Sequence, residues 1–151
     1  MRIGSNYSFE DLRNSPAIVV GAFNNRWTMH LTENLHFAFV EKNAGDTIQE
    51  QIPGGRMWSD PVVNPPGEAT DYAIVARLMD SKTGQFTVAV AGIMGAGTQA
   101  AAEFVSNPEN LEEGLRGAPA DWRTRDLEIV LQTTVTDSVA GPPHVVATYY
   151  W

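Results

Sequence analysis

The chain has 151 residues, 43% of them hydrophobic and 19% charged, which predicts one globular domain with a core of its own. Its formal net charge is −8, with only ten lysines and arginines, and this balance argues against direct binding to nucleic acids or anionic membranes. The lack of cysteine excludes disulfides, thiol catalysis and cysteine-ligated zinc. No apolar run is long enough to span a bilayer.

The first forty residues predict a helix, a strand, a second helix and a second strand. Ser8 can cap a short helix over residues 8–13. Residues 17–23 are apolar without polar alternation, so we expect them to form a central strand. A helix over residues 26–35 and a short strand over 37–40 follow.

Residues 41–68 are rich in proline, glycine and aspartate, which are turn-forming residues. We expect an irregular, loop-rich insert with one or two short strands. Trp58 lies within it, and we expect its side chain at a ligand or partner surface, because long loops in compact domains are often functional. A mobile loop is the alternative.

The clearest hairpin covers residues 70–79 and 85–92, with Gly84 at a turn position that favours positive φ. A glycine-rich turn follows, and then a helix to about Val105.

The last third of the chain predicts one more helix and a second hairpin. Ser106 and Glu109 have the spacing of a capping box, so we expect a helix that begins there and ends near Gly117. Residues 127–136 and 144–151 form the last strands, at one side of the sheet. The order of elements predicts an α/β fold, a mixed sheet in two or three layers with flanking helices.

The turns after Phe23 and after Gly92 both follow apolar strands. If those strands are parallel neighbours, both turns open on the same edge of the sheet, which is where open α/β sheets bind ligands. The glycine turn is not a P-loop, since no Gly-Lys-Ser/Thr follows, and its glycine spacing differs from the dinucleotide fingerprint. Tight packing of the strand onto the helix is the favoured interpretation, and contact with a polar or anionic ligand is the alternative.

The candidate ligand-binding residues come from these two turns and from the insert. Backbone N–H groups of the turns would hold a polar or anionic group, and the guanidinium of Arg26 would supplement them. An asparagine helix cap beside a solvated arginine is the competing interpretation of the first turn. The full candidate set is Phe23, Asn24, Asn25, Arg26, Gly95, Gly97, Thr98 and Trp58.

No residue pattern indicates catalysis, a metal site or a cofactor. The three histidines lack the H-E-x-x-H spacing, and no G-x-S-x-G motif is present. We therefore expect no enzymatic activity. The alternative is a small hydrolase or transferase that uses the same cleft, with Glu103 or a histidine as base.

Four stretches, in this order, resemble a bacterial domain family that is frequent in acidobacteria. They cover residues 16–25, 72–77, 91–105 and 145–148, and the resemblance leaves out residues 41–68. Proteins of this family are signalling or regulatory proteins in which the domain often follows a winged-helix-like DNA-binding module. The resemblance implies a sensory or scaffolding module, and this chain has no recognisable DNA-binding module itself.

The sequence therefore predicts a non-enzymatic sensory or interaction module, excised from a longer regulatory protein whose other domains are its partners. A small polar or anionic ligand would bind at the carboxyl edge of the sheet. We favour a cytoplasmic location, with the extracytoplasmic side of a membrane-anchored parent as the alternative. A pure oligomerisation module, such as a homodimer, is the third hypothesis.

Overall fold

The computed structural model describes residues 8–43, 45–59 and 68–151. In chain order its helices and strands are α1 Phe9–Arg13, β1 Ala17–Val20, α2 Arg26–Thr32, β2 Phe37–Val40, β3 Thr47–Glu50, β4 Met57–Ser59, β5 Glu68–Leu78, β6 Thr87–Gly92, α3 Gly95–Ser106, α4 Pro108–Gly114, the 3₁₀ helix η1 Trp122–Thr124, β7 Leu127–Thr136, β8 Val139–Ala140 and β9 His144–Tyr150. None of the described helices is both long and apolar enough to cross a bilayer.

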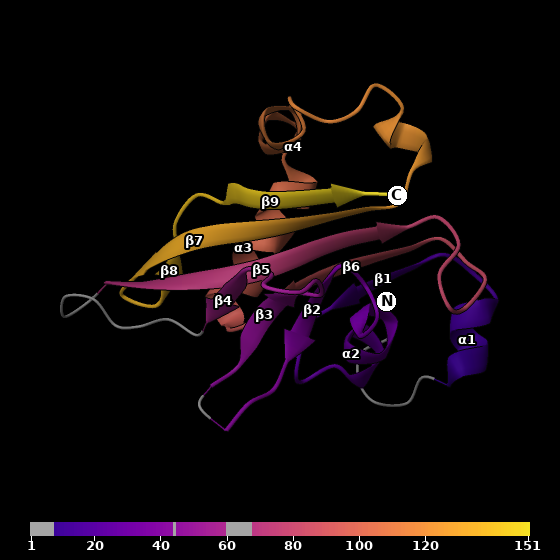
Figure 1. Ribbon diagram of the computed structural model, residues 1–151, viewed down its shortest axis with the longest axis horizontal. Coiled ribbons are helices and arrows are strands. Elements are labelled where there is room, and N and C mark those ends of the chain that lie inside the picture. Colours follow the sequence, from indigo (N-terminus) through magenta and orange to yellow (C-terminus); the bar gives the residue numbers. More distant parts are fainter. Residues whose placement is uncertain (1–7, 44, 60–67) are drawn as a thin grey trace.

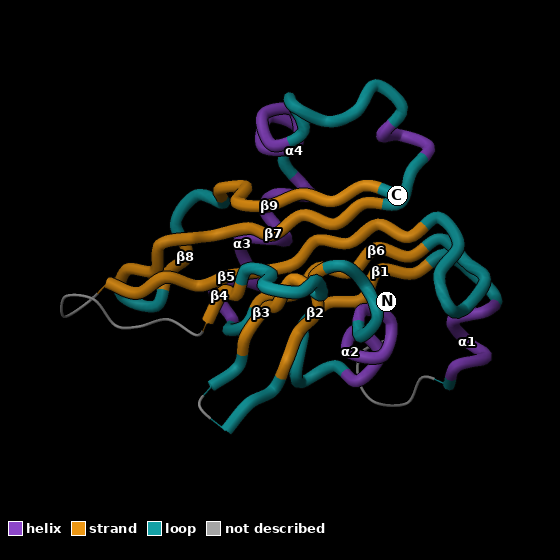
Figure 2. Tube along the Cα trace, in the orientation of Figure 1, coloured by secondary structure: helices purple, strands orange, loops and turns teal. Residues whose placement is uncertain are grey.

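The strands form two sheets, and the fold is mixed α/β as the sequence predicts. Sheet A has the order β1-β6-β5-β7-β8, and β9 also pairs with β7. Only the β1–β6 pair is parallel, and the other pairs of sheet A are antiparallel. Sheet B has the order β2-β3-β4 and is antiparallel. Figure 1 shows sheet B in front of sheet A and α3 behind it, and Figure 2 gives the same view by secondary structure.

The long strand β5 divides the interior into two cores, because successive side chains of a strand point to opposite faces. Ile74 and Ala76 contact one core, which also receives sheet B and α2. Ala73 and Val75 contact the other, which is covered by α3 and α4. Sheet A is therefore the middle layer of three.

The first strand is an edge strand, and the prediction of a central position is wrong. β1 pairs only with β6. Val19 is buried, but Ile18 and Val20 keep 72% and 53% of their surface exposed. The apolar run suggested burial on both faces, whereas only the face toward sheet B and α2 is covered at this edge.

The helix boundaries differ from the prediction in two places. α4 is capped by Asn107, whose Oδ1 accepts from the Glu109 N–H at 2.9 Å, while Ser106 belongs to the last turn of α3. Pro108 explains this, since proline favours the first helical position and places the cap directly before it. α4 then ends at Gly114, and α2 ends at Thr32, both earlier than expected.

The other predicted elements are present. Ser8 caps α1, and Gly84 has a φ of 72° in the β5–β6 hairpin. The insert contributes two short strands: β3 pairs with β2, and β4 pairs with β3, which completes sheet B. Residues 60–67 of the insert lie outside the described part of the chain.

Candidate functional site

The two turns singled out from the sequence lie at the same edge of sheet A. β1 and β6 are parallel neighbours, with Val20 opposite Val90, and the Gly21 N–H donates to the Val90 carbonyl at 3.0 Å. The turns that follow both strands are therefore adjacent, as expected from parallel pairing.

The backbone N–H groups of the glycine turn are bound by the protein's own carboxylate. Asp71 is fully buried, and its Oδ1 accepts from the N–H groups of Tyr72 at 2.7 Å and Met94 at 3.2 Å. Its Oδ2 accepts from the Gly97 N–H at the start of α3. Asp71 thus occupies the place where we expected an anionic ligand at the positive end of the helix. The sequence shows only an acid within a mostly apolar strand, and this does not identify the N–H groups from which it accepts.

Gly92 allows β6 to approach α3 closely, and Gly97 allows α3 to approach β5. A Cβ on Gly92 would lie 2.2 Å from the Thr98 nitrogen, and a Cβ on Gly97 would lie 2.6 Å from the Tyr72 carbonyl oxygen. Both distances are far below van der Waals contact, so the glycine pattern is explained by packing. Gly95 is exposed, and a Cβ there would meet no atom within 4 Å.

The remaining turn residues mostly serve the local structure. Asn25 caps α2 by accepting from the Trp27 N–H at 3.0 Å, and its Nδ2 donates to the Val20 carbonyl at 2.9 Å. Asn24 and Arg26 are exposed, and the Arg26 guanidinium carbon lies 5.1 Å from the centre of the Trp27 ring. These contacts fit the interpretation of an asparagine cap beside a solvated arginine.

Thr98 also bonds within the turn, since its Oγ1 accepts from the Gly92 N–H at 2.9 Å. Phe23 and Trp58 are partly buried against the core between the two sheets. Trp58 lies in β4, with its ring edge-to-face to Phe37 at 5.7 Å. The structure therefore brings together the residues of the two turns, and places Trp58 on sheet B.

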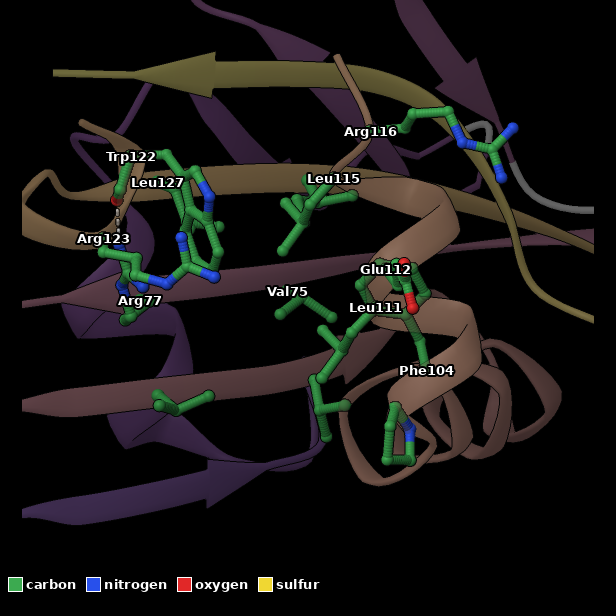
Figure 3. Close-up of a pocket in the computed structure, with 14 residues that line it drawn as sticks. Val75, Arg77, Phe104, Leu111, Glu112, Leu115, Arg116, Trp122, Arg123 and Leu127 are labelled. Atoms are coloured by element: carbon green, nitrogen blue, oxygen red, sulfur yellow. Dashed lines mark hydrogen bonds between the residues drawn. The ribbon is translucent and has the colours of Figure 1, made fainter. Parts of the chain in front are cut away.

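A large pocket lies elsewhere, on the helix-covered face of sheet A (Figure 3). Its volume is about 770 Å³, within the range of small-molecule sites. Its floor comes from β5, β6 and β7, and its walls from α3, α4 and η1. The lining residues are Val75, Arg77, Val88, Phe104, Val105, Pro108, Leu111, Glu112, Leu115, Arg116, Trp122, Arg123, Leu127 and Ile129.

The pocket lies toward the end of the sheet opposite the glycine turn. Val88 is near the start of β6 and pairs with Arg77 near the end of β5, whereas Gly92 ends β6. In Figure 3, Trp122, Arg77 and Arg123 form one end of the pocket, and Leu111 and Phe104 lie at the other.

Arg77 holds the irregular segment around η1 against the sheet. Its Nη2 donates to the carbonyl oxygens of Trp122 and Arg125, while its buried Nε has no hydrogen-bond partner among the described residues. Burial lowers the pKa of Arg77, and the charge of Asp126 partly offsets this. The Arg77 and Arg123 guanidinium carbons lie 5.1 and 4.7 Å from the centre of the Trp122 ring.

A separate polar cluster connects sheet B to sheet A. Glu50 accepts from Arg56 Nε at 2.9 Å, and its Oε1 is 3.0 Å from His36 Nε2. The hydrogen bonds from Arg56 lower the pKa of Glu50 to about 2. His36 stacks on Tyr149 at 3.8 Å. No group of three or more potential metal ligands occurs in the described part of the chain.

Glu128 of β7 is a buried acid between the two sheets. Its side chain is fully buried, its Oε2 accepts from the Phe37 N–H of β2 at 3.0 Å, and its Oε1 has no hydrogen-bond partner among the described residues. Burial raises its pKa to about 8, despite hydrogen bonds from the Phe37 and His36 backbone. A neutral carboxylic acid therefore connects the two sheets at pH 7.

Sequence reasoning missed the pocket, because its lining comes from four separated segments of the chain. The one local signal was Trp122 followed by Arg123 and Arg125. Comparison of the chain with family models, with curated proteins and with solved structures found no match. The resemblance to the acidobacterial-type family stays a prediction. A proposal on function must therefore be based on the geometry of the sites.

Proposed function

We propose that the protein is a non-enzymatic ligand-binding module, and that its site is the pocket between sheet A and the α3–α4–η1 segment. The observation that carries this proposal is the pocket's volume of about 770 Å³ with predominantly apolar walls. Protein interiors are close-packed, so a hollow of this size over the core is typical of a binding site.

The helix above the pocket supports this proposal. Leu111 of α4 and Leu115, the residue that caps the C-terminus of α4, line the pocket but are only half-buried, and α4 has no buried residue at all. An apolar ligand below α4 would remove these side chains from water, with a gain of roughly 25 cal/mol per Å² of apolar surface.

The chemistry of the lining favours binding over catalysis. Glu112 is the one acid among the residues that line the pocket, and no histidine, serine, threonine or tyrosine accompanies it. General acid–base catalysis needs a positioned base that a second group supports. The role in a bacterial regulatory protein, in which ligand occupancy would be passed to other domains, follows from the family resemblance and is part of the proposal.

The test is titration with N-phenyl-1-naphthylamine, an uncharged apolar probe whose fluorescence rises on leaving water. We expect saturable one-to-one binding to the wild type and at least about tenfold weaker binding to Leu111→Trp, in which the larger ring fills the pocket. Val139→Trp is the matched control, since Val139 is 59% exposed on β8, outside the residues that line the pocket.

Absence of saturable binding to the folded wild type would overturn the proposal. It would favour the assembly hypothesis, for which the exposed Ile18 and Val20 of the β1 edge are the candidate surface. Equal binding to Leu111→Trp would place the probe elsewhere.

A further inference from the structure

We propose that the natural ligand of this pocket is a small amphipathic anion, an apolar body with one carboxylate, and that its carboxylate is bound at the Trp122 end by Arg123 and Arg77. This inference rests on the proposed function and adds the ligand class.

The distribution of charge is the first argument. The chain has 18 acids against ten lysines and arginines, yet three of those ten line this pocket. In an acidic protein the default neighbours of an arginine are carboxylates. Among the described residues, however, neither Arg116 nor Arg123 forms an ion pair, although Arg56 and Arg125 do. Arg116 and Arg123 therefore bring to the pocket positive charge that no ion pair within the described part of the chain neutralises.

The arrangement at Trp122 is the second argument. Two guanidinium groups contact one indole ring, at 4.7 and 5.1 Å from its centre. Both guanidinium groups bring positive charge to the same ring, and an anion bound beside this ring would be attracted to each of them. Arg77 also retains a buried Nε without a partner, and a buried donor of this kind calls for an acceptor.

The shape of the lining is the third argument. Val75, Phe104 and Leu111 give the middle and the far part of the pocket apolar side chains, so a second charged group on the ligand would be desolvated against them. Arg116 also lines the pocket, but its side chain extends away from Val75 and Leu111 in Figure 3. Glu112 lies on the α4 side of the pocket, away from Trp122 in Figure 3. An anionic group is thereby favoured at the Trp122 end and an apolar body toward α4.

The experiment is competition for the bound N-phenyl-1-naphthylamine by decanoate and by 1-decanol, which share an apolar chain and differ in the charged group. We expect decanoate to displace the probe from the wild type at about tenfold lower concentration than decanol. Arg123→Gln should remove most of this preference and leave the decanol and probe affinities unchanged. Glu112→Gln should raise the affinity for decanoate alone, since it removes a repelling carboxylate.

Arg26→Gln is the matched control, because Arg26 is also an exposed arginine beside a tryptophan and lies outside the pocket, in the turn first predicted to bind an anion. The Arg26→Gln variant should prefer decanoate over decanol as strongly as the wild type does. Equal displacement by decanoate and decanol would overturn the ligand class while leaving the binding module intact, because the probe would still bind. If the preference for decanoate over decanol survives in Arg123→Gln but is lost in Arg26→Gln, the ligand's carboxylate does not bind at the Trp122 end, and this assignment is overturned.

Discussion

Glu128 illustrates how one buried carboxyl can make the stability of the whole fold depend on pH. Its pKa is about 8 in the folded protein and near 4.5 in an unfolded chain, so the folded state holds the proton more tightly. A raised acid pKa contributes stability below the unfolded value, and this contribution is lost as the pH rises from about 4.5 through about 8.

We predict that Glu128→Gln removes this part of the pH dependence. Glutamine can still accept from the Phe37 N–H and cannot ionise. The free energy of unfolding of the variant, minus that of the wild type, should therefore rise by a few kcal/mol between pH 5 and pH 9, at about 1.36 kcal/mol per pKa unit. Urea unfolding at both pH values measures this. Glu103→Gln, at an exposed position on α3, is the control and should leave the pH profile unchanged. Parallel profiles for Glu128→Gln and the wild type would contradict the prediction.

At the scale of the element, the β6–turn–α3 unit is a tightly packed strand and helix. The carboxylate of Asp71 accepts from the N-terminus of α3. Residue type alone predicted the strand, the glycine turn and the helix, because each has a local signature. The sequence could not reveal that Asp71 would fill the N-terminus of α3, since that contact joins residues 26 positions apart.

The glycines of this unit should differ sharply in their tolerance of a methyl group. We predict that Gly92→Ala lowers the free energy of unfolding by about 1–3 kcal/mol or more, because its Cβ would overlap the backbone of Gly97 and Thr98. Gly95→Ala should be neutral or stabilising by up to about 1 kcal/mol, since space is open there and alanine favours the helix. Chemical denaturation of both variants tests the contrast, and similar losses at the two sites would count against the packing interpretation.

For the whole molecule, the α/β class and both hairpins could be predicted from local patterns. The parallel pairing of β1 with β6 was a condition for bringing the two turns together and not a prediction from those patterns. The edge position of β1 could not be predicted, because an apolar run does not reveal that only one of its faces will be covered. The pocket is also a tertiary property. Trp122 and Leu111 are ordinary apolar residues in the sequence, and their shared lining depends on how α4 and η1 lie over the sheet.

We predict that the two sheets unfold together. The core between them combines Phe37 and Ile48 of sheet B with Ile74 and Val130 of sheet A, so neither sheet has an interior of its own on that side. Denaturation curves from far-ultraviolet circular dichroism and from tryptophan fluorescence should coincide in the wild type, in Trp58→Phe and in Trp122→Phe. Two separate transitions would show that sheet B is an independently stable unit.

The register of sheet A also has a mechanical consequence. Ala17 pairs with Thr87, Thr87 with Leu78, Arg77 with Leu127 and Leu127 with Tyr150, so β1 begins and β9 ends at the same end of the sheet. A force applied between these two points acts across the strands, and strand hydrogen bonds would then break one after another from that end. Under tension the domain should therefore unzip at low force, and the pocket, which lies near that end, would open early.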